Sequence, residues 1–371
     1  MRILFTGGGT GGHIFPLVAV ARKLRGFAMP NDDTAEFLFV GPDGFSRSVF
    51  RNENIRVKVV LAAKFRRYFS PLNFIDLLKL PIGLLQAYWH LFWFMPDVVF
   101  AKGGYGSVLV VFIAWLFRIP VVIHESDIIP GLANKFLAKF ARKIIVAFDY
   151  TLSFFPANKT IASGNPIREE LFYTVPKNAR ELLGLVSDKP AVFIIGGSQG
   201  AQEINNMVLL ALPDLVKKYE VVHQCGENNL DMMKKGEILQ LKTPEERALY
   251  HQYGTLNEQE MASAYYLAGI IVSRAGSGAI FEIAASGKPS ILIPYFEAAG
   301  AHQLKNAEVY RDAGACRILR GGNLLPHIFI SEIDAIINDT ATWQAMSQAA
   351  LSFAKPNASS EIAAEVLKAA E

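Results

Sequence analysis

Residues 2–13 read RILFTGGGTGGH, a short apolar strand that runs directly into a glycine-rich loop. A second stretch at 191–201, AVFIIGGSQGA, repeats this order of strand and glycine turn. Glycine lets the backbone turn sharply, and the amide groups at the start of a following helix attract anions. The two stretches predict two α/β halves in tandem, each of which begins with an anion-binding turn.

Apolar segments of strand length continue through both halves and are separated by helical stretches. Such Val, Ile and Phe runs between Gly and Pro are typical of parallel sheets covered on both faces by helices. We expect strands at 2–6, 37–41, 57–61, 97–101, 120–124 and 144–147, and again at 190–195, 220–224, 248–252, 269–273, 290–294 and 316–319. Turn residues gather at 162–166, which predicts domains at 1–162 and 163–355 and a C-terminal helix within 356–371 that packs back on the first domain.

The composition, with 51% hydrophobic and 19% charged residues, is typical of a well-packed globular protein. Residues 1–162 carry 19 Lys and Arg against 10 Asp and Glu, whereas residues 163–371 carry 18 against 24. The basic half suits a polyanionic or membrane-surface partner, or it only keeps a hydrophobic domain in solution. The two cysteines, Cys225 and Cys316, are too few for a disulfide framework or a zinc site and fit a reducing compartment.

Residues 64–75 interleave basic and aromatic side chains and precede an uncharged, tryptophan-rich segment of 17 residues at 80–96. That segment is shorter than the ~20 apolar residues of a spanning helix, so we expect a soluble or peripheral protein. The basic and aromatic cluster predicts contact with an anionic membrane surface. The alternative is a buried crossover helix whose Trp and Phe belong to the core. The predicted contact residues are Lys64, Phe65, Arg66, Arg67, Tyr68 and Phe69.

Ligands of open α/β sheets bind at the carboxyl ends of the strands. Three such ends in the first half carry glycines or polar side chains, namely the opening loop, the loop at 103–107 and the segment 124–127. We therefore expect them to line one crevice. Its candidate residues are Gly9, Thr10, Gly11, Gly12, His13, Gly103, Gly104, Tyr105, His124, Glu125 and Asp127.

In the second half, glycine-rich turns at 196–200 and 274–278 predict a nucleotide-diphosphate site on helix N-termini. Glu282, in the first turns of the second of these helices, could accept hydrogen bonds from both ribose hydroxyls, or could only stabilise the helix dipole. Polar residues near 302 follow the next strand. The candidate residues are Ser198, Gln199, Ser277, Gly278, Ala279, Ile280, Phe281, Glu282, His302 and Gln303.

The opening loop also matches the dinucleotide pattern G-x-G-x-x-G at Gly7, Gly9 and Gly12. The acid that this pattern expects ~20 residues further on is poorly placed, because Asp43 lies 31 residues after Gly12. A second nucleotide-type turn in the other half fits two substrates better than one nicotinamide cofactor. The sequence thus favours a transferase over a dehydrogenase or a hydrolase.

Seven motifs in order resemble the MurG family of glycosyltransferases across essentially the whole chain. They are GGGTGGHIFP, GGYGS, PVVIHES, GNPIR, GGSQGA, SRAGSGAIFEIAASGKPSILIP and HQLKNA. The resemblance implies a glycosyltransferase B fold, with two Rossmann-like α/β domains facing across a cleft. It implies inverting transfer of GlcNAc from UDP-GlcNAc to the polyprenyl-diphosphate acceptor lipid I, which makes lipid II. It also implies a peripheral position on the cytoplasmic face of the cell membrane, with no cofactor, metal or nucleic acid. The oligomeric state stays open.

By position, the resemblance makes His13 the catalytic histidine, with Glu125 and His124 as rival bases. Histidine suits proton removal from the acceptor hydroxyl near neutral pH. The donor-binding positions expected are Thr10, Gly11, Gly12, Asp127, Arg168, Ser198, Gln199, His302, Gln303 and the turn 277–282, with Glu282 on the ribose.

One departure from the family pattern is Asp127, which stands where the family commonly has Asn. A carboxylate beside a diphosphate is unfavourable unless it acts as a base or pairs with a cation. The alternatives that this departure leaves open are a related lipid-linked acceptor and a different UDP-sugar. A separate, non-enzymatic alternative is a membrane-binding protein that responds to nucleotide sugars without catalysis.

Overall fold

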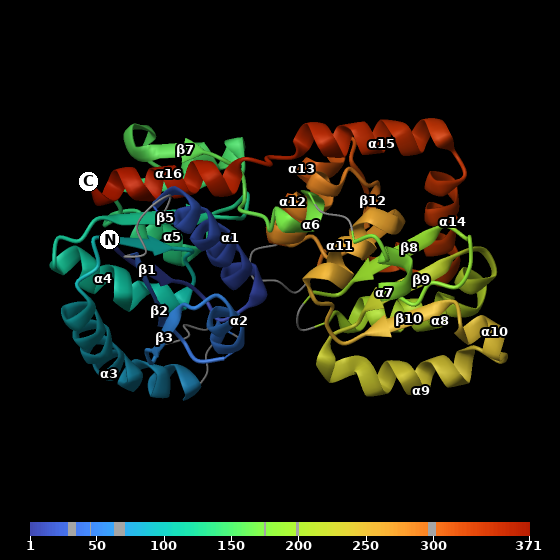
Figure 1. The fold of residues 1–371 in the computed structure, drawn as a ribbon, viewed down its shortest axis with the longest axis horizontal. Coiled ribbons are helices and arrows are strands. Elements are labelled where there is room, and N and C mark those ends of the chain that lie inside the picture. Colours follow the sequence, from blue (N-terminus) through green and yellow to red (C-terminus); the bar gives the residue numbers. More distant parts are fainter. Residues whose placement is uncertain (29–34, 45, 63–70, 174–175, 198–199, 296–301) are drawn as a thin grey trace. The chain divides into compact units, whose positions relative to one another are not determined.

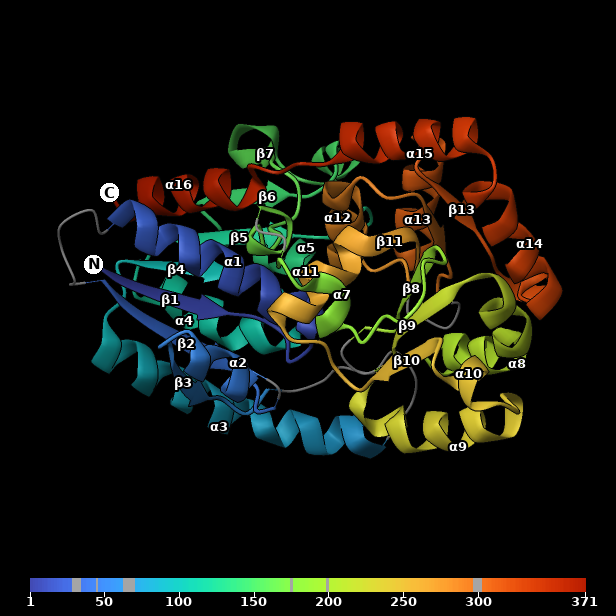
Figure 2. The same ribbon diagram turned by 45° about the vertical axis from the view of Figure 1, so that its right-hand side comes forward.

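The computed structural model describes residues 1–28, 35–44, 46–62, 71–173, 176–197, 200–295 and 302–371. The chain divides into two compact units, Met1–Ile167 together with Lys355–Glu371, and Arg168–Ala354. Each unit is built on a parallel sheet with helices on both faces (Figures 1 and 2). The expected α/β class with two Rossmann-like domains is confirmed.

Unit 1 contains a seven-stranded sheet of order β3-β2-β1-β4-β5-β6-β7, the doubly wound order of nucleotide-binding folds. Its strands are β1 (Arg2–Thr6), β2 (Glu36–Gly41), β3 (Arg56–Val59), β4 (Val98–Ala101), β5 (Val121–Glu125), β6 (Lys143–Val146) and β7 (Thr160–Ala162). The register pairs Thr6 with Ala101 and Ala101 with Ile123, so β1, β4 and β5 end at one edge. The sequence predicted all of these strands within two residues except β7, a short edge strand in a segment rich in turn residues.

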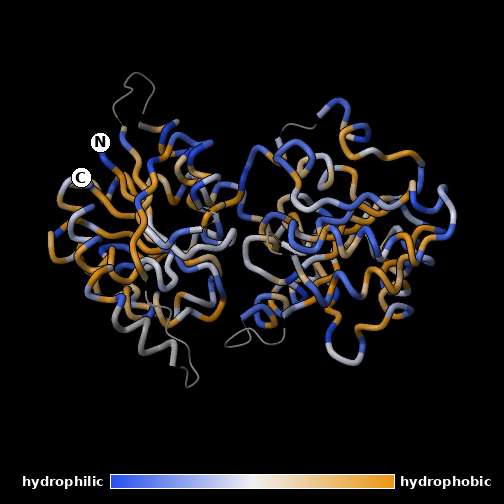
Figure 3. Tube along the Cα trace, turned by 90° about the horizontal axis from the view of Figure 1, so that it is seen from below, coloured by the Kyte–Doolittle hydropathy of each residue, from blue (hydrophilic) through white to orange (hydrophobic). Residues whose placement is uncertain are grey.

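Helices cover the two faces of this sheet as the alternation of side chains requires. Phe5 and its neighbours face α1, α2 and α16, whereas Leu4 and its neighbours face α3, α4 and α5. Figure 3 shows the hydrophobic strands inside each unit. The helices are α1 (Gly11–Ala28), α2 (Ser46–Asn52), α3 (Pro71–Phe94), α4 (Val108–Leu116), α5 (Leu132–Leu137) and α16 (Ala358–Ala370), with 3-10 turns η1 (Tyr105–Ser107), η2 (Asp149–Phe154) and η3 (Ala157–Lys159).

Helix α16, the last helix of the chain, packs against α1 of unit 1 (Figures 1 and 2). Ile362, Ala363 and Val366 are fully buried there, at the one-turn spacing that places them on a single face. Glu365 forms an ion pair of 3.2 Å with Lys143. The C-terminal segment is therefore an integral part of unit 1.

Helix α3 buries only one face. Ala87, Leu91 and Phe94 lie in the core, whereas Leu85 is 70% exposed, Trp89 59% and Trp93 67%. The interpretation of this segment as a fully buried crossover helix is therefore wrong for its Trp residues. Among the described helices, none combines the length and apolarity needed to span a bilayer.

Unit 2 contains a six-stranded parallel sheet of order β10-β9-β8-β11-β12-β13. Helices α8 and α14 pack on one face, and α11, α12 and α13 on the other. The strands are β8 (Ala191–Ile195), β9 (Glu220–Gln224), β10 (Tyr250–Tyr253), β11 (Ala268–Ser273), β12 (Ser290–Leu292) and β13 (Cys316–Ile318). The helices are α6 (Glu170–Tyr173), α7 (Ala179–Leu182), α8 (Gln202–Lys218), α9 (Leu230–Gln240), α10 (Pro244–Arg247), α11 (Glu258–Leu267), α12 (Ser277–Ser286), α13 (His302–Asp312), α14 (Pro326–Ile337) and α15 (Thr340–Phe353), with 3-10 turns η4 (Glu227–Asn229) and η5 (Gly321–Asn323).

Candidate functional site

His13 lies in the first turn of α1, directly after the opening glycine loop. The backbone amide of His13 donates to the Thr10 carbonyl at 2.9 Å, which starts the helix. The Thr10 hydroxyl lies 2.9 Å from His13 Nδ1, within hydrogen-bond distance. Thr10 therefore fixes the orientation of the imidazole from one side of the ring.

Two glycines leave room for the imidazole ring. A Cβ atom at Gly8 would lie 2.9 Å from His13 Nδ1, and one at Gly104 would lie 3.2 Å from His13 Nε2. Gly104 has φ 80° and ψ 168°, a conformation that residues with a side chain rarely adopt. The glycines at the ends of β1 and β4 thus let the backbone approach the ring closely.

The surroundings of His13 keep its imidazole neutral. The pKa of His13 is lowered to about 4; burial is the largest cause, the positive charge of Lys102 also lowers the pKa, and the negative charge of Asp127 opposes both. At neutral pH the ring therefore carries one unprotonated nitrogen. That is the state a general base requires.

Lys102, at the end of β4, is the main residue of this crevice that the sequence reasoning missed. Its side chain is 2% exposed. The ammonium group donates to His124 Nδ1 at 2.5 Å, to Asn165 Oδ1 at 2.9 Å and to the Ser126 hydroxyl. Burial lowers the pKa of this ammonium, and the carboxylates of Glu125 and Asp127 act in the opposite direction.

His124 uses both of its ring nitrogens within unit 1. Its Nε2 donates to the Gly164 carbonyl at 3.0 Å, which leaves Nδ1 as the acceptor for Lys102. Burial and the charge of Lys102 hold the pKa of His124 well below its usual range. His124 is thus a neutral, fully buried group, and its position does not suit a base that acts on substrate.

Glu125 is also occupied by the protein itself. Its carboxylate accepts from the amides of Asp127 and Gly131 at 3.0 Å each, and from Asn134 Nδ2 at 2.9 Å. Burial and the nearby Asp127 raise the pKa of Glu125. The catalytic role expected for Glu125 stays a prediction, and these contacts favour a role in holding the loop after β5.

The other candidates of unit 1 lie at the same edge of the sheet. Gly103 has φ 80° and packs on Asn134, whose Oδ1 would lie 2.4 Å from a Cβ at this position. Tyr105 begins η1 and is partly exposed. Gly9, Gly11 and Gly12 belong to the loop and the first residues of α1. Residues 64–69, the predicted membrane contact, lie outside the described residues.

In unit 2, helix α12 begins with an N-terminus that no side chain caps. Gly276 is the N-cap residue, so the first amide groups, those of Ser277, Gly278 and Ala279, have no side-chain acceptor from the cap. The Ser277 hydroxyl is buried and has no partner among the described residues. A helix start with uncapped amide groups and a hydroxyl without a described partner suits an anionic group.

Glu282 lies one turn further along α12 and is held by two side chains. Arg168 donates to both carboxylate oxygens, at 3.0 and 3.2 Å, and the Tyr265 hydroxyl donates to Oε2 at 3.1 Å. Arg168 and Glu282, expected separately at the donor, are therefore a partly buried ion pair. Ile280 and Phe281, on the turn between, are buried in the core.

The remaining candidates of unit 2 surround the start of α13. Gln303 Oε1 accepts from the Tyr295 amide at 3.0 Å, and the Arg274 guanidinium lies 4.7 Å from the centre of the Tyr295 ring. The buried Nδ1 of His302 has no partner among the described residues. Ser198 and Gln199 lie outside the described residues, between Gly197 (φ 81°) and Gly200 (φ 75°).

Family models match both units of the chain. The N-terminal domain of glycosyltransferase family 28 matches residues 3–146, and its C-terminal domain matches residues 191–362. The Treponema denticola UDP-N-acetylglucosamine–N-acetylmuramyl-(pentapeptide) pyrophosphoryl-undecaprenol N-acetylglucosamine transferase is 37% identical over 88% of this chain and 86% of its own. A Bacillus cereus transferase of the same name, numbered 2, is 38% identical over 86% of both chains. The chain belongs to the MurG family.

The fold agrees with this family. The crystal structure of Acinetobacter baumannii MurG has a TM-score of 0.72 and 23% identity, and covers 99% of both chains. At that identity the likeness shows the fold alone. The chain therefore has the MurG-family architecture of two Rossmann-like domains, the glycosyltransferase B fold.

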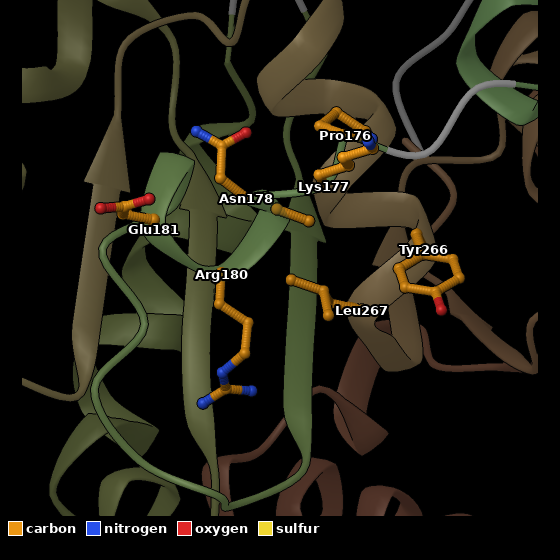
Figure 4. A pocket seen from close by; sticks show the side chains of 8 residues that line it. Pro176, Lys177, Asn178, Arg180, Glu181, Tyr266 and Leu267 are labelled. Atoms are coloured by element: carbon orange, nitrogen blue, oxygen red, sulfur yellow. The ribbon is translucent and has the colours of Figure 1, made fainter.

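A hollow of about 460 Å³ in unit 2 is lined by residues 176–181, which include part of α7, and by Tyr266 and Leu267. Figure 4 shows the side chains that line it. Tyr266 and Leu267 directly precede β11, so the hollow lies at the amino end of that strand. The MurG-family candidate residues follow the carboxyl ends instead. The hollow is therefore separate from the candidate site. Within the described ranges, no group of three or more His, Cys, Asp and Glu residues is placed to hold a metal ion.

Lys102, Asn134 and Asn165 lie among the candidate residues of unit 1 and were missed by the sequence reasoning. A single lysine after an apolar strand looks like a solvated end of that strand. The burial of Lys102 depends on the tertiary fold, which brings Ser126 and Asn165, 24 and 63 residues further along the chain, beside its ammonium group. One sequence signal for a nearby cation was Asp127. A carboxylate beside a diphosphate is unfavourable unless it acts as a base or pairs with a cation.

Proposed function

We propose that this chain transfers GlcNAc from UDP-GlcNAc to the 4-hydroxyl of MurNAc in undecaprenyl-diphospho-MurNAc-pentapeptide, lipid I, to make lipid II for peptidoglycan synthesis. The transferase names of the Treponema denticola and Bacillus cereus relatives support this reaction. We assign the acceptor and the membrane contact to residues 1–162, and the donor to residues 163–355. The main support for the proposal is the neutral imidazole of His13, which lies between glycines at the carboxyl ends of β1 and β4.

His13 acts as the general base in this proposal. The proposal uses the tautomer in which Nδ1–H donates to the Thr10 hydroxyl, 2.9 Å away, so that Nε2 takes the proton of the acceptor 4-hydroxyl. The acceptor oxygen attacks C1 of GlcNAc as the bond from C1 to the diphosphate oxygen breaks. The sugar is inverted at C1, the proton remains on His13, and UDP leaves with the bonding electrons.

The departing diphosphate binds at the start of α12. The amide groups of Ser277, Gly278 and Ala279 point along the helix axis and carry its positive dipole. The buried Ser277 hydroxyl adds a donor. These groups stabilise the charge that develops on UDP, so the proposal requires no metal ion. We assign Glu282 to the ribose, and Gln199, His302 and Gln303 to the same ligand.

The membrane contact includes the exposed face of α3. Leu85, Trp89 and Trp93 recur at the spacing of one helical face, and the Trp89 and Trp93 rings lie 5.6 Å apart. Trp115 and Leu116 of α4, which packs against α3, are also about half exposed. Aromatic side chains of this kind partition into the interfacial region of a bilayer. The proposal places the protein peripherally on the cytoplasmic membrane face.

The test is transfer of labelled GlcNAc from UDP-GlcNAc to a short-chain lipid I analogue, with diacylglycerol as a competing acceptor class. We expect a disaccharide product from lipid I, formed equally well in excess EDTA. Product from diacylglycerol alone would assign a different lipid acceptor. No product from either, with UDP binding intact, would favour a binding protein without catalysis.

A further inference from the structure

One partly buried arginine of unit 2 lacks an acceptor for its N–H groups among the described residues. Arg274 directly follows β11 and lies two residues before Gly276, the N-cap of α12. Its guanidinium lies 4.7 Å from the centre of the Tyr295 ring, and the described part of the chain offers it no hydrogen bond or ion pair. A cation–π contact orients a guanidinium but supplies no lone pair for its five N–H groups.

The other buried or partly buried arginines of unit 2 have such acceptors. Arg168 and Arg317 each donate to a glutamate, and Arg247 donates to two backbone carbonyls. Moving a charged group out of water costs free energy unless the group is paired or hydrogen-bonded. Arg274 departs from this pattern, and it does so next to a helix start that also lacks a cap.

Further donors without described acceptors lie at that helix start. Ser277, the first residue of α12, is 4% exposed, and its hydroxyl has no partner among the described residues. The first amide groups of the helix have no side-chain cap. Ser277 follows Arg274 by three residues, so their Cα atoms lie no more than about 11 Å apart. A guanidinium, a buried hydroxyl and helix amides are the donors that an anion with several oxygens requires.

Helix α13 holds the two loops that carry these donors. Asn306 Nδ2 donates to the Ala275 carbonyl at 3.4 Å, in the turn before α12. Gln303 Oε1 accepts from the Tyr295 amide at 3.0 Å, in the loop after β12. Strands β11 and β12 pair in parallel up to their carboxyl ends. The ring beside the guanidinium and the turn that precedes the helix are therefore anchored to the same support.

We propose that Arg274 is the cationic ligand of the donor diphosphate at the start of α12 and gives this site its preference for diphosphate over uncharged uridine ligands. This inference rests on the proposed function, which places the diphosphate there and names no cation for it. Arginine offers a permanent charge and several N–H donors in one plane, which suits phosphate oxygens.

The same contact acts on the leaving group. When the bond from C1 to the diphosphate oxygen breaks, its electron pair stays on that oxygen, and UDP gains one negative charge. The guanidinium stabilises this charge through N–H donors and transfers no proton, because the proton of the acceptor hydroxyl goes to His13. A group that binds the developing charge more strongly than the ground state accelerates the reaction.

The experiment measures the affinities of UDP and uridine for wild type and for Arg274→Met. Methionine keeps an unbranched apolar stem beside the Tyr295 ring and removes the charge. We expect UDP to bind about 10- to 150-fold more weakly, the range for a hydrogen bond to a charged group. Uridine should bind within about twofold of wild type. The matched control is Arg311→Met, which removes the same charge at an exposed position at the other end of α13 and should leave UDP affinity unchanged.

Two further variants separate charge from shape. Arg274→Lys keeps the charge and should bind UDP with an affinity between those of wild type and Arg274→Met. Tyr295→Phe keeps the ring and should bind UDP within about twofold of wild type. Single-turnover transfer at saturating UDP-GlcNAc should fall in Arg274→Met, because the developing charge on UDP loses its cation.

The outcomes distinguish this inference from the proposed function. If wild type transfers nothing, yet Arg274→Met loses affinity for UDP and not for uridine, the proposed transfer fails and the diphosphate ligand stands. Wild-type UDP affinity in Arg274→Met, or equal losses for UDP and uridine in a folded protein, would overturn the inference. Circular dichroism identifies a misfolded Arg274→Met. Arg274→Gln then replaces it, and the same two results decide.

Discussion

Glu282 has fewer free acceptor positions than its sequence context suggests. A carboxylate offers about four lone-pair positions. Arg168 Nε occupies one on Oε1, while Arg168 Nη2 and the Tyr265 hydroxyl occupy two on Oε2. One position therefore remains, on Oε1. Glu282 can accept from one ribose hydroxyl rather than from both.

The perturbation is Glu282→Gln, which keeps the shape and removes the charge. One hydrogen bond to a charged group contributes about 1.5–3 kcal/mol. We therefore expect UDP to bind about 10- to 150-fold more weakly, since each 1.4 kcal/mol is a factor of about ten. Isothermal titration calorimetry measures this directly. Because the substitution also weakens a partly buried ion pair, titration is done well below the unfolding midpoint of the variant.

The matched control is Tyr265→Phe, which removes one donor to Glu282 and leaves its charge. We expect UDP affinity there within about threefold of wild type, as for one neutral-donor contact. The 2′-deoxy and 3′-deoxy analogues of UDP then test the number of contacts. In wild type, one analogue should lose affinity through Glu282, and that loss should vanish in Glu282→Gln. If both analogues lose affinity through Glu282, or if the variant binds UDP like wild type, the reasoning is wrong.

Three further predictions follow from unit 1. Gly104→Ala forces a side chain into a glycine-only conformation beside His13 Nε2. We expect the free energy of unfolding in urea to fall by about 1–3 kcal/mol. The rate of transfer should fall by a larger fraction than this free energy does, and full activity would refute the contact. The pKa of His13 is lowered to about 4, with burial as the largest cause, so the imidazole stays unprotonated from pH 6.5 down to about pH 4. The acid limb of kcat/KM should therefore lie near pH 4, and a limb at 6.5 would contradict this. The double variant Trp89→Ser, Trp93→Ser should bind anionic vesicles about tenfold or more weakly than wild type in a sedimentation assay. The matched control Leu239→Ser, at a 70% exposed position on α9, should have no effect, and equal losses would refute a specific surface.

The strands were predictable because a parallel sheet buried on both faces needs continuous Val, Ile and Phe runs, and such runs are local. Strand β7 was not predicted, because its three residues at the edge of the sheet form too short an apolar run. The exposure of one face of α3 could not be predicted either, because tryptophan residues at helical spacing occur in a buried core as well as on a surface.

The places of the candidate residues in the fold were predictable, and their contacts were less so. Glycines follow β1, β4 and β11, and His13 and Glu282 lie after β1 and β11 as expected; their role in ligand binding stays a prediction. Their partners come from distant segments: Arg168 reaches Glu282 across 114 residues. Lys102 was missed because nothing in its neighbours along the chain indicates burial. Long-range pairing of this kind depends on the tertiary fold and leaves no local pattern.

The most direct test of the account is the single-turnover rate of GlcNAc transfer by His13→Ala with both substrates saturating. We predict a fall of at least ~100-fold, as expected for a lost general base, with UDP affinity unchanged. His327→Ala, at an exposed position of α14, is the matched control and should transfer at the wild-type rate. A His13→Ala rate within a few-fold of wild type would contradict the assignment of the base and the role of the glycine loop that surrounds it.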